Sequence, residues 1–275
     1  MKFGKIKSTK IRIGDISISY RIKKGTSDNT PTLLFLHGFP FNKNMWHSQL
    51  ELLSDEYTAI AVDFRGHGNS TTGHGFFSID VFAKDLLVFI KKLKLTNVCV
   101  CGISMGGYVA LRAYEIQNDA FQGLILCDTH CFADSKEAKQ KRFDTIQAVL
   151  KHGKRPFSIG FIQKLFTKEG EETQPEAVKM IKSSIRRNSV STICSTLLAL
   201  ASRTDTSDVL SQITIPTLLV RGKEDKITPK EDMDYMHEKI KDSQFVEIEQ
   251  SGHLPHLEQP EEFSQVIHEY LEKHF

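Results

Sequence analysis

The sequence predicts an α/β protein built on a mostly parallel, doubly wound sheet. Three observations carry this prediction. Short apolar segments such as 32–36, 97–101 and 217–220 alternate with longer segments whose apolar residues recur at helical spacing. The short segments are apolar almost without interruption, as in strands that helices cover on both faces. The length of 275 residues is enough for one large α/β domain with an insertion.

The individual elements follow from local patterns. Residues 10–23 alternate apolar and polar side chains, which predicts a hairpin that turns at Gly14 and Asp15. A helix over 44–53 would begin with Asn44 as its N-cap, and one over 78–93 with Ser78. Further strands are expected at 58–64, 122–127 and 244–249, and further helices at 108–116, 229–240 and 260–275.

The strand–helix alternation stops between about residues 130 and 207. This stretch contains helical segments at 135–151, 175–188 and 190–201 and no convincing strand. We therefore predict a core made of residues 1–129 and 208–275, and a helical cap, or lid, made of residues 130–207. Such a lid would cover the carboxyl edge of the sheet, where open α/β sheets bind ligands.

Composition excludes several classes of function. With 36 basic and 34 acidic residues, the formal charge of +2 gives no reason to expect nucleic-acid or membrane-surface binding. No apolar run approaches the roughly 18 residues of a membrane span, and the first residues lack the apolar stretch of a signal peptide. Five cysteines without metal-ligand spacing predict reduced, buried thiols and no metal. We expect a cytoplasmic protein; the oligomeric state stays open.

The most informative motif is Gly-Ile-Ser-Met-Gly at residues 102–106, between a predicted strand and a predicted helix. Gly-x-Ser-x-Gly in this position predicts a nucleophile elbow, in which a sharp turn lifts the serine hydroxyl above the sheet. The glycines permit the strained backbone and the close packing. Ser104 is therefore the candidate nucleophile, and the amino end of the next helix favours negative charge beside it.

A serine nucleophile needs a base and an acid that orients the base. Residues 251–256 after the last strand offer His253 and His256; we favour His253, because Gly252 permits a sharp turn towards the crevice. For the acid we favour Asp225, in the loop after the strand at 217–220. Glu224 and Asp128 are the alternatives. The order serine, aspartate, histidine is typical of enzymes with this elbow.

Backbone N–H groups would form the oxyanion hole. Gly38 follows the strand at 32–36 and lets the N–H of Phe39 point at the crevice; the second donor would be the N–H of Met105. We interpret His37 as structural. The glycine-rich segment 63–70 lacks the pattern of a nucleotide loop, and its Arg65 and His67 would brace the neighbouring loops.

With these motifs in order, the chain resembles the α/β-hydrolase superfamily over nearly its whole length. Within it, the sequence is similar to small carboxylesterases and to proteins like 3-oxoadipate enol-lactonase and pimeloyl-carrier-protein esterase. Haloalkane dehalogenases and epoxide hydrolases carry aspartate where this chain has Ser104. The motifs that carry the resemblance are His37-Gly-Phe-Pro40, Asp63-Phe-Arg-Gly-His-Gly-Asn-Ser70, Gly102-Ile-Ser-Met-Gly-Gly107 and Ser251-Gly-His-Leu-Pro-His-Leu-Glu-Gln-Pro260.

The resemblance implies an eight-stranded, mostly parallel sheet with helices on both faces and a helical lid. It also implies the family roles for Ser104, Asp225, His253, Phe39 and Met105, and cleavage of a small ester or lactone without a cofactor. The aromatic stretch 157–166 of the lid favours an apolar substrate. A thioesterase, C–C hydrolase or perhydrolase with the same triad, and a small-ligand receptor with slow turnover, are the alternatives.

Overall fold

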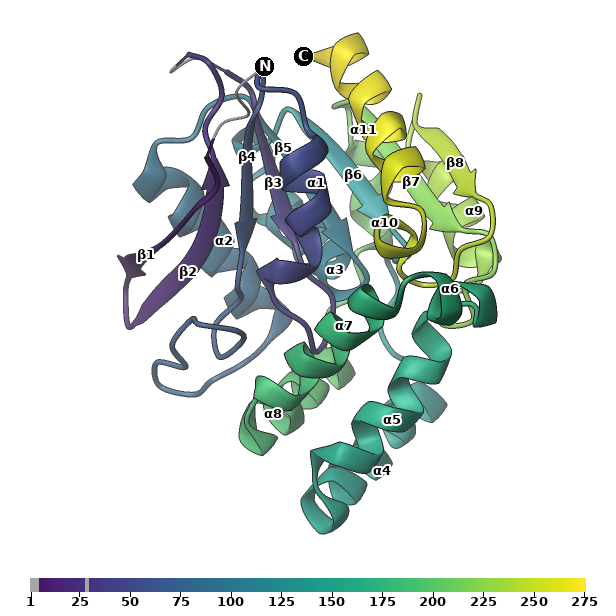
Figure 1. Cartoon of the computed structure of the whole chain (residues 1–275). Coiled ribbons are helices and arrows are strands. Elements are labelled where there is room, and N and C mark those ends of the chain that lie inside the picture. Colours follow the sequence, from purple (N-terminus) through teal and green to yellow (C-terminus); the bar gives the residue numbers. More distant parts are fainter. Residues whose placement is uncertain (1–4, 28–29) are drawn as a thin grey trace.

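The computed structural model describes residues 5–27 and 30–275 of the chain (Figure 1). Residues 1–4, on which part of the signal-peptide argument depends, lie outside the described residues. The described chain forms an eight-stranded sheet in the order β1-β2-β4-β3-β5-β6-β7-β8. The strands are β1 (Lys7–Ile13), β2 (Ile16–Lys23), β3 (Thr32–Leu36), β4 (Thr58–Val62), β5 (Val98–Ile103), β6 (Gly123–Cys127), β7 (Thr217–Gly222) and β8 (Gln244–Ile248).

The sheet is mostly parallel, as the apolar strand segments predict. β1 and β2 form the expected hairpin, with Gly14 at φ +50° in its turn. β2 pairs antiparallel with β4, and all the other neighbouring strands are parallel. The carboxyl ends of β3, β5, β6, β7 and β8 therefore lie along one edge of the sheet, and every predicted site residue follows one of these ends.

Helices cover both faces of the sheet (Figure 1). One apolar core lies between the sheet and α2 (Ile79–Leu93), α3 (Met105–Ile116) and α9 (Lys230–Lys239). A second core lies between the opposite face and α1 (His47–Leu52), α10 (Pro255–Glu258) and α11 (Pro260–His274). The predicted fold class is confirmed. Short 3₁₀ segments, η1 (Lys43–Trp46), η2 (Asn118–Ala120) and η3 (Ser207–Gln212), connect these elements.

Five helices lie between β6 and β7, and the described residues there contain no strand. They are α4 (Lys136–His152), α5 (Lys154–Leu165), α6 (Lys168–Thr173), α7 (Pro175–Arg187) and α8 (Val190–Ala201). Asn188 after α7 donates to the carbonyl of Pro40, and Thr192 in α8 to that of Gly66. Since both carbonyls belong to loops after β3 and β4, these helices cover the carboxyl edge. This placement supports our proposed division into core 1–129 and 208–275 and cap 130–207.

Some predicted boundaries need correction. Asn44 is not a helix N-cap: the chain begins η1 at Lys43, and the side chain of Asn42 accepts from the Asn44 N–H at 3.0 Å. The strand predicted at 58–64 ends at Val62, because Asp63 turns into a loop whose contacts its side chain organises. The cap prediction at Ser78 is confirmed, since its hydroxyl accepts from the Val81 N–H.

Candidate active site

Ser104 lies between β5 and α3 in a strained backbone conformation, with φ +51° and ψ −117°. Non-glycine residues adopt such angles rarely and mainly at functional sites. The flanking glycines are required by close packing. A β-carbon on Gly102 would be 2.4 Å from the carbonyl oxygen of Gly106, and one on Gly106 would be 2.4 Å from that of Leu36. The tight turn leaves Ser104 partly exposed, while its neighbours on both sides are buried.

The loop after β3 lies directly against this turn. A β-carbon on Gly38 would be 3.4 Å from the Ser104 Cβ. The N–H groups of Phe39 and Met105 have no hydrogen-bond acceptor within the described part of the chain. Met105 is the first residue of α3, where backbone N–H groups are free to bind an anion. Both predicted oxyanion donors are therefore available beside Ser104.

His253 and Asp225 meet at this same edge of the sheet. The Nδ1 of His253 is 2.9 Å from the Oδ2 of Asp225, and both side chains are buried. The other oxygen of Asp225 accepts from the Ile227 N–H at 2.7 Å. Burial by itself would raise the pKa of Asp225, but His253 and these hydrogen bonds outweigh it, so the pKa lies below its ordinary value. The carboxylate is thus held ionised against the imidazole.

A chain of contacts connects this pair to the nucleophile turn. The hydroxyl of Thr129, just after β6, donates to the carbonyl of Ser104 at 2.8 Å. The hydroxyl of Thr228, three residues after Asp225, donates to the carbonyl of Asp128 at 3.0 Å. The loops after β5, β6 and β7 are therefore joined by hydrogen bonds, which fixes their relative positions.

The residues that are alternatives for the base and the acid lie in different environments. His256 is fully buried and packs against Trp46 with ring centroids 4.3 Å apart; burial lowers the pKa of its imidazole to about 3. Glu224 is exposed. Asp128 is fully buried next to Asp225, so the geometry favours His253 with Asp225 and leaves Asp128 as a close neighbour.

His37 and His67 are structural, as predicted. The Nε2 of His37 accepts from the Phe64 N–H at 3.1 Å, and burial lowers the pKa of the ring to about 3. His67 contacts the carbonyl of Arg65 and the hydroxyl of Thr196 in the lid. The guanidinium of Arg65 binds two carboxylates, those of Asp85 at 2.6 Å and Asp15 at 3.3 Å. These residues brace the loop after β4.

Glu258 is a residue of the site that the sequence did not reveal. It is 2% exposed. Its Oε1 accepts from the Gly252 N–H, adjacent to His253, at 2.8 Å. Its Oε2 accepts from the N–H and the hydroxyl of Thr167 in the lid, at 2.8 and 2.7 Å. The His253 N–H itself donates to the lid carbonyl of Leu165 at 2.9 Å. The loop of His253 and the lid are therefore connected through the carboxylate of Glu258 and through this backbone hydrogen bond.

Two further features of the described chain have the dimensions of a binding site. The side chains of Asp128, Asp225 and His253 place ligand atoms within 4.8 Å of one another, so they could hold a cation. A cation there would displace the proton that the 2.9 Å contact between His253 and Asp225 requires.

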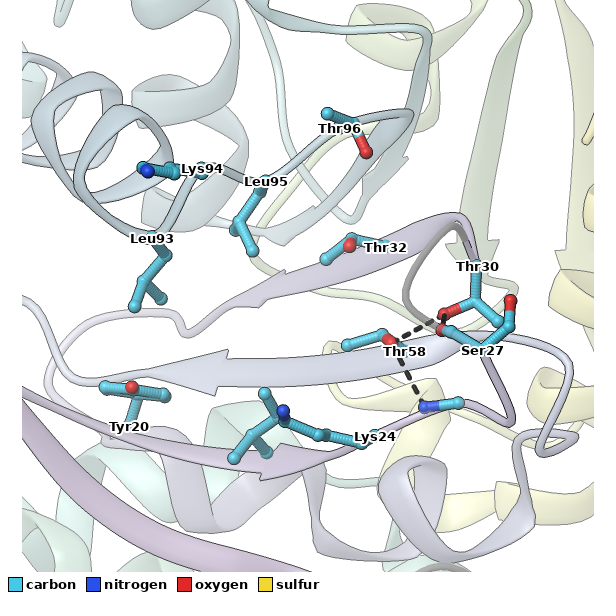
Figure 2. Close-up of a pocket in the computed structure, with 12 residues that line it drawn as sticks. Tyr20, Lys24, Ser27, Thr30, Thr32, Thr58, Leu93, Lys94, Leu95 and Thr96 are labelled. Atoms are coloured by element: carbon cyan, nitrogen blue, oxygen red, sulfur yellow. Dashed lines mark hydrogen bonds between the residues drawn. The ribbon is translucent and has the colours of Figure 1, made fainter.

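A pocket of about 350 Å³ lies at the opposite edge of the sheet (Figure 2). Thr32 and Thr58, which begin β3 and β4, line it, whereas Ser104 follows the carboxyl end of β5.

No helix in the described residues is both long and apolar enough to cross a membrane. All five cysteines are free and buried, as predicted. Cys101 and Cys127 lie on neighbouring strands with their sulfur atoms 4.0 Å apart.

Several known proteins resemble this chain in sequence or in fold. The chain is 28% identical to the 3-oxoadipate enol-lactonase 2 of Acinetobacter baylyi, over 94% of each chain. It is 29% identical to a pimeloyl-[acyl-carrier protein] methyl ester esterase of Nitrosomonas europaea, over 86% of this chain and 94% of that one. A thermophilic esterase from Thermogutta terrifontis, solved with malate bound, superposes with a TM-score of 0.89 at 34% identity, covering 98% of this chain and 100% of the other. Residues 31–260 match the family described as alpha/beta hydrolase fold, and the chain belongs to this family.

Proposed function

We propose that the chain is a serine hydrolase that cleaves a carboxylic ester or lactone of a small, largely apolar substrate through an acyl-enzyme on Ser104. The observation that carries the proposal is the buried 2.9 Å contact between His253 and Asp225, at the same edge of the sheet as a partly exposed serine in a strained turn. Similarity to an esterase and to an enol-lactonase supports a carboxylic ester hydrolase.

In the proposed reaction, each group has one role. Asp225 holds the proton of His253 on Nδ1, which leaves Nε2 free to accept the proton of the Ser104 hydroxyl. The alkoxide attacks the carbonyl carbon, and the N–H groups of Phe39 and Met105 stabilise the resulting oxyanion. Each such donor contributes about 3–4 kcal/mol in serine hydrolases. His253 then protonates the leaving alkoxide and later activates the water that releases the acid.

Aromatic side chains support an apolar substrate. Phe157 and Phe161 of α5 stack with ring centroids 5.4 Å apart, and each lies 6.2 Å from the ring of Phe39. These rings pack against the loop after β3, which carries the proposed oxyanion donor, and provide an apolar surface for the acyl group.

The guanidinium of Arg203, which lies against α3, is not available to bind a charged substrate. The guanidinium of Arg203 lies 4.4 Å from the ring of Tyr108, one turn after Ser104. Its nitrogens are already bound inside the protein, to Asp134, to His130 and to the carbonyls of Phe132 and Leu200. We therefore expect uncharged acyl groups to react faster than those that carry a carboxylate.

The test combines a panel of p-nitrophenyl esters with Ser104→Ala. We expect turnover of short neutral esters, labelling by a fluorophosphonate probe, and a loss of at least ~1000-fold in kcat in the variant. Ser191→Ala, at an exposed serine of α8, is the matched control and should retain wild-type activity. Turnover of an acyl thioester or a diketone but of no ester would favour the alternative chemistries. A folded wild type that neither turns over nor reacts with the probe would favour a receptor.

A further inference from the structure

Asp128 has an unusual position beside the proposed catalytic pair. It follows β6 directly, at φ +41°, and is completely buried. Its Oδ1 accepts from the Gly222 N–H at 2.9 Å. Its Oδ2 has neither an N–H nor a hydroxyl donor among the described residues. Because a buried carboxylate oxygen without a donor is costly, this oxygen needs an explanation.

The surroundings of Asp128 are acidic. Ligand atoms of Asp128, Asp225 and His253 lie within 4.8 Å of one another, and the thiol of Cys127 is the adjacent titratable group on β6 itself. No lysine or arginine in the described chain forms an ion pair with either carboxylate. The nearby Arg221 binds Glu247 and backbone carbonyls instead.

Two ionised carboxylates in this dry environment would repel one another without a counter-charge. Burial raises the pKa of Asp128 well above its ordinary value, and the charge of Asp225 and a hydrogen bond shared with it raise the pKa further. The pKa of Asp225 lies below its ordinary value. The pKa values of the two acids are thus shifted in opposite directions, so that Asp128 is neutral while Asp225 is ionised.

We infer that Asp128 is a positioning residue that carries a proton and donates it in a hydrogen bond to Asp225, so that the carboxylate facing His253 is held in place. The inference rests on the proposed function of Ser104, Asp225 and His253. The proton stays on Asp128 throughout the reaction, and His253 remains the only group that exchanges protons with substrate. Asp128 therefore acts through Asp225 and does not touch the reacting atoms.

The inference predicts opposite results for two substitutions. In Asp128→Asn, the amide oxygen can accept from the Gly222 N–H and the amide nitrogen can donate to Asp225, so both contacts persist. In Asp128→Ala, Asp225 loses a donor to its ionised form. Such hydrogen bonds are strong enough that kcat should fall by about 10-fold or more. We expect the asparagine variant to lose no more than about 3-fold.

The pH profile separates positioning from mere folding support. The donated hydrogen bond weakens the negative potential that Asp225 exerts on His253. Its loss in Asp128→Ala should stabilise the imidazolium and move the acidic limb of kcat/KM to higher pH. The asparagine variant should keep the wild-type limb. Equal damage in both variants, or an alanine variant identical to wild type, would overturn the inference.

An infrared comparison tests the proton directly and needs no turnover. At neutral pH, the difference spectrum of wild type minus Asp128→Asn should contain the band of one protonated carboxyl group. Its absence would overturn the inference even if the alanine variant does not fold. Ester turnover that depends on Ser104, together with a negative infrared result, would refute the role of Asp128 alone. A positive infrared result in a protein without ester turnover would refute the proposed function alone.

Discussion

Replacing Glu258 tests whether one carboxylate holds the lid against the loop of His253. Three buried donors depend on this side chain: the Gly252 N–H, the Thr167 N–H and the Thr167 hydroxyl. The hydroxyl can rotate towards another acceptor, but the two backbone N–H groups in Glu258→Ala cannot. Leaving a buried donor unsatisfied costs about 1–3 kcal/mol, so we expect the free energy of unfolding to fall by roughly 2–6 kcal/mol.

Activity should fall together with stability. Gly252 precedes His253, whose own N–H donates to the lid carbonyl of Leu165. Freeing this loop would let the imidazole drift from its position against Asp225, and a displacement of about 1 Å can cost roughly 100-fold in rate. Glu258→Gln keeps the shape but places an amide N–H₂ against one of the donors. Its effect should lie between those of wild type and the alanine variant.

Thermal and urea unfolding measure the first effect, and kcat measures the second. For a chain of this size we expect the melting temperature to fall by roughly 5–20 °C. Glu262→Ala is the matched control, because Glu262 is exposed in the first turn of α11. There the change should stay within about 1 kcal/mol. A Glu258→Ala protein as stable and active as the control would refute the idea that this carboxylate fixes the loop.

Three further predictions concern the framework of the site. Gly106→Ala should destabilise the protein strongly in urea unfolding, because its β-carbon would lie 2.4 Å from a carbonyl oxygen of β3; Gly160→Ala, with open space around it in α5, should stabilise it by about 0.5–1 kcal/mol. Asp63→Asn breaks a buried ion pair with Lys43 and should cost about 3–5 kcal/mol, whereas Glu249→Gln, in an exposed pair with Lys223, should cost under about 1 kcal/mol in the same assay. Acid should also destabilise the fold, because burial lowers the pKa of His37, His67 and His256 to about 3. The unfolded chain binds protons at these histidines below about pH 6.5, so stability is complete above that pH and falls by roughly 3–4 kcal/mol per unit between about pH 6 and 4. Urea unfolding at several pH values measures this slope, and a flat profile would contradict it.

The strands and most helices could be predicted because their patterns are local. Buried parallel strands are continuous apolar runs, and a cap such as Ser78 satisfies N–H groups within its own turn. The error at Asn44 has the same origin, since two asparagines lie within one turn and only the 3₁₀ geometry of η1 selects Asn42. The sequence pattern does not predict α5 as a separate helix, because Pro156 and Gly160 interrupt it. The burial of Ile162 and Leu165 of α5 in the apolar core compensates for the cost of the interrupting residues in this helix.

For the site, prediction from the sequence has a different limit. Motifs were enough to propose Ser104, His253 and Asp225, because each follows a predicted strand and the chain order is that of the elbow enzymes. The supporting acids could not be selected in this way. Asp128 and Glu258 matter only because β6, β7 and β8 are consecutive in the sheet and because a lid loop returns to the loop after β8. Those neighbours are set by tertiary packing, which no local pattern encodes.

The two buried acids, Glu258 and Asp128, support the imidazole of His253 in different ways. The carboxylate of Glu258 accepts from three donors and fixes the backbone on one side of His253. Asp128 lies beside Asp225, the acid that holds the imidazole ring of His253. A substitution at Glu258 should therefore change stability and kcat together. A substitution at Asp128 should change the protonation of His253 with less effect on the lid. If the two positions gave the same ratio of stability loss to activity loss, a general loosening of the carboxyl edge would explain both, and neither acid would have a separate role.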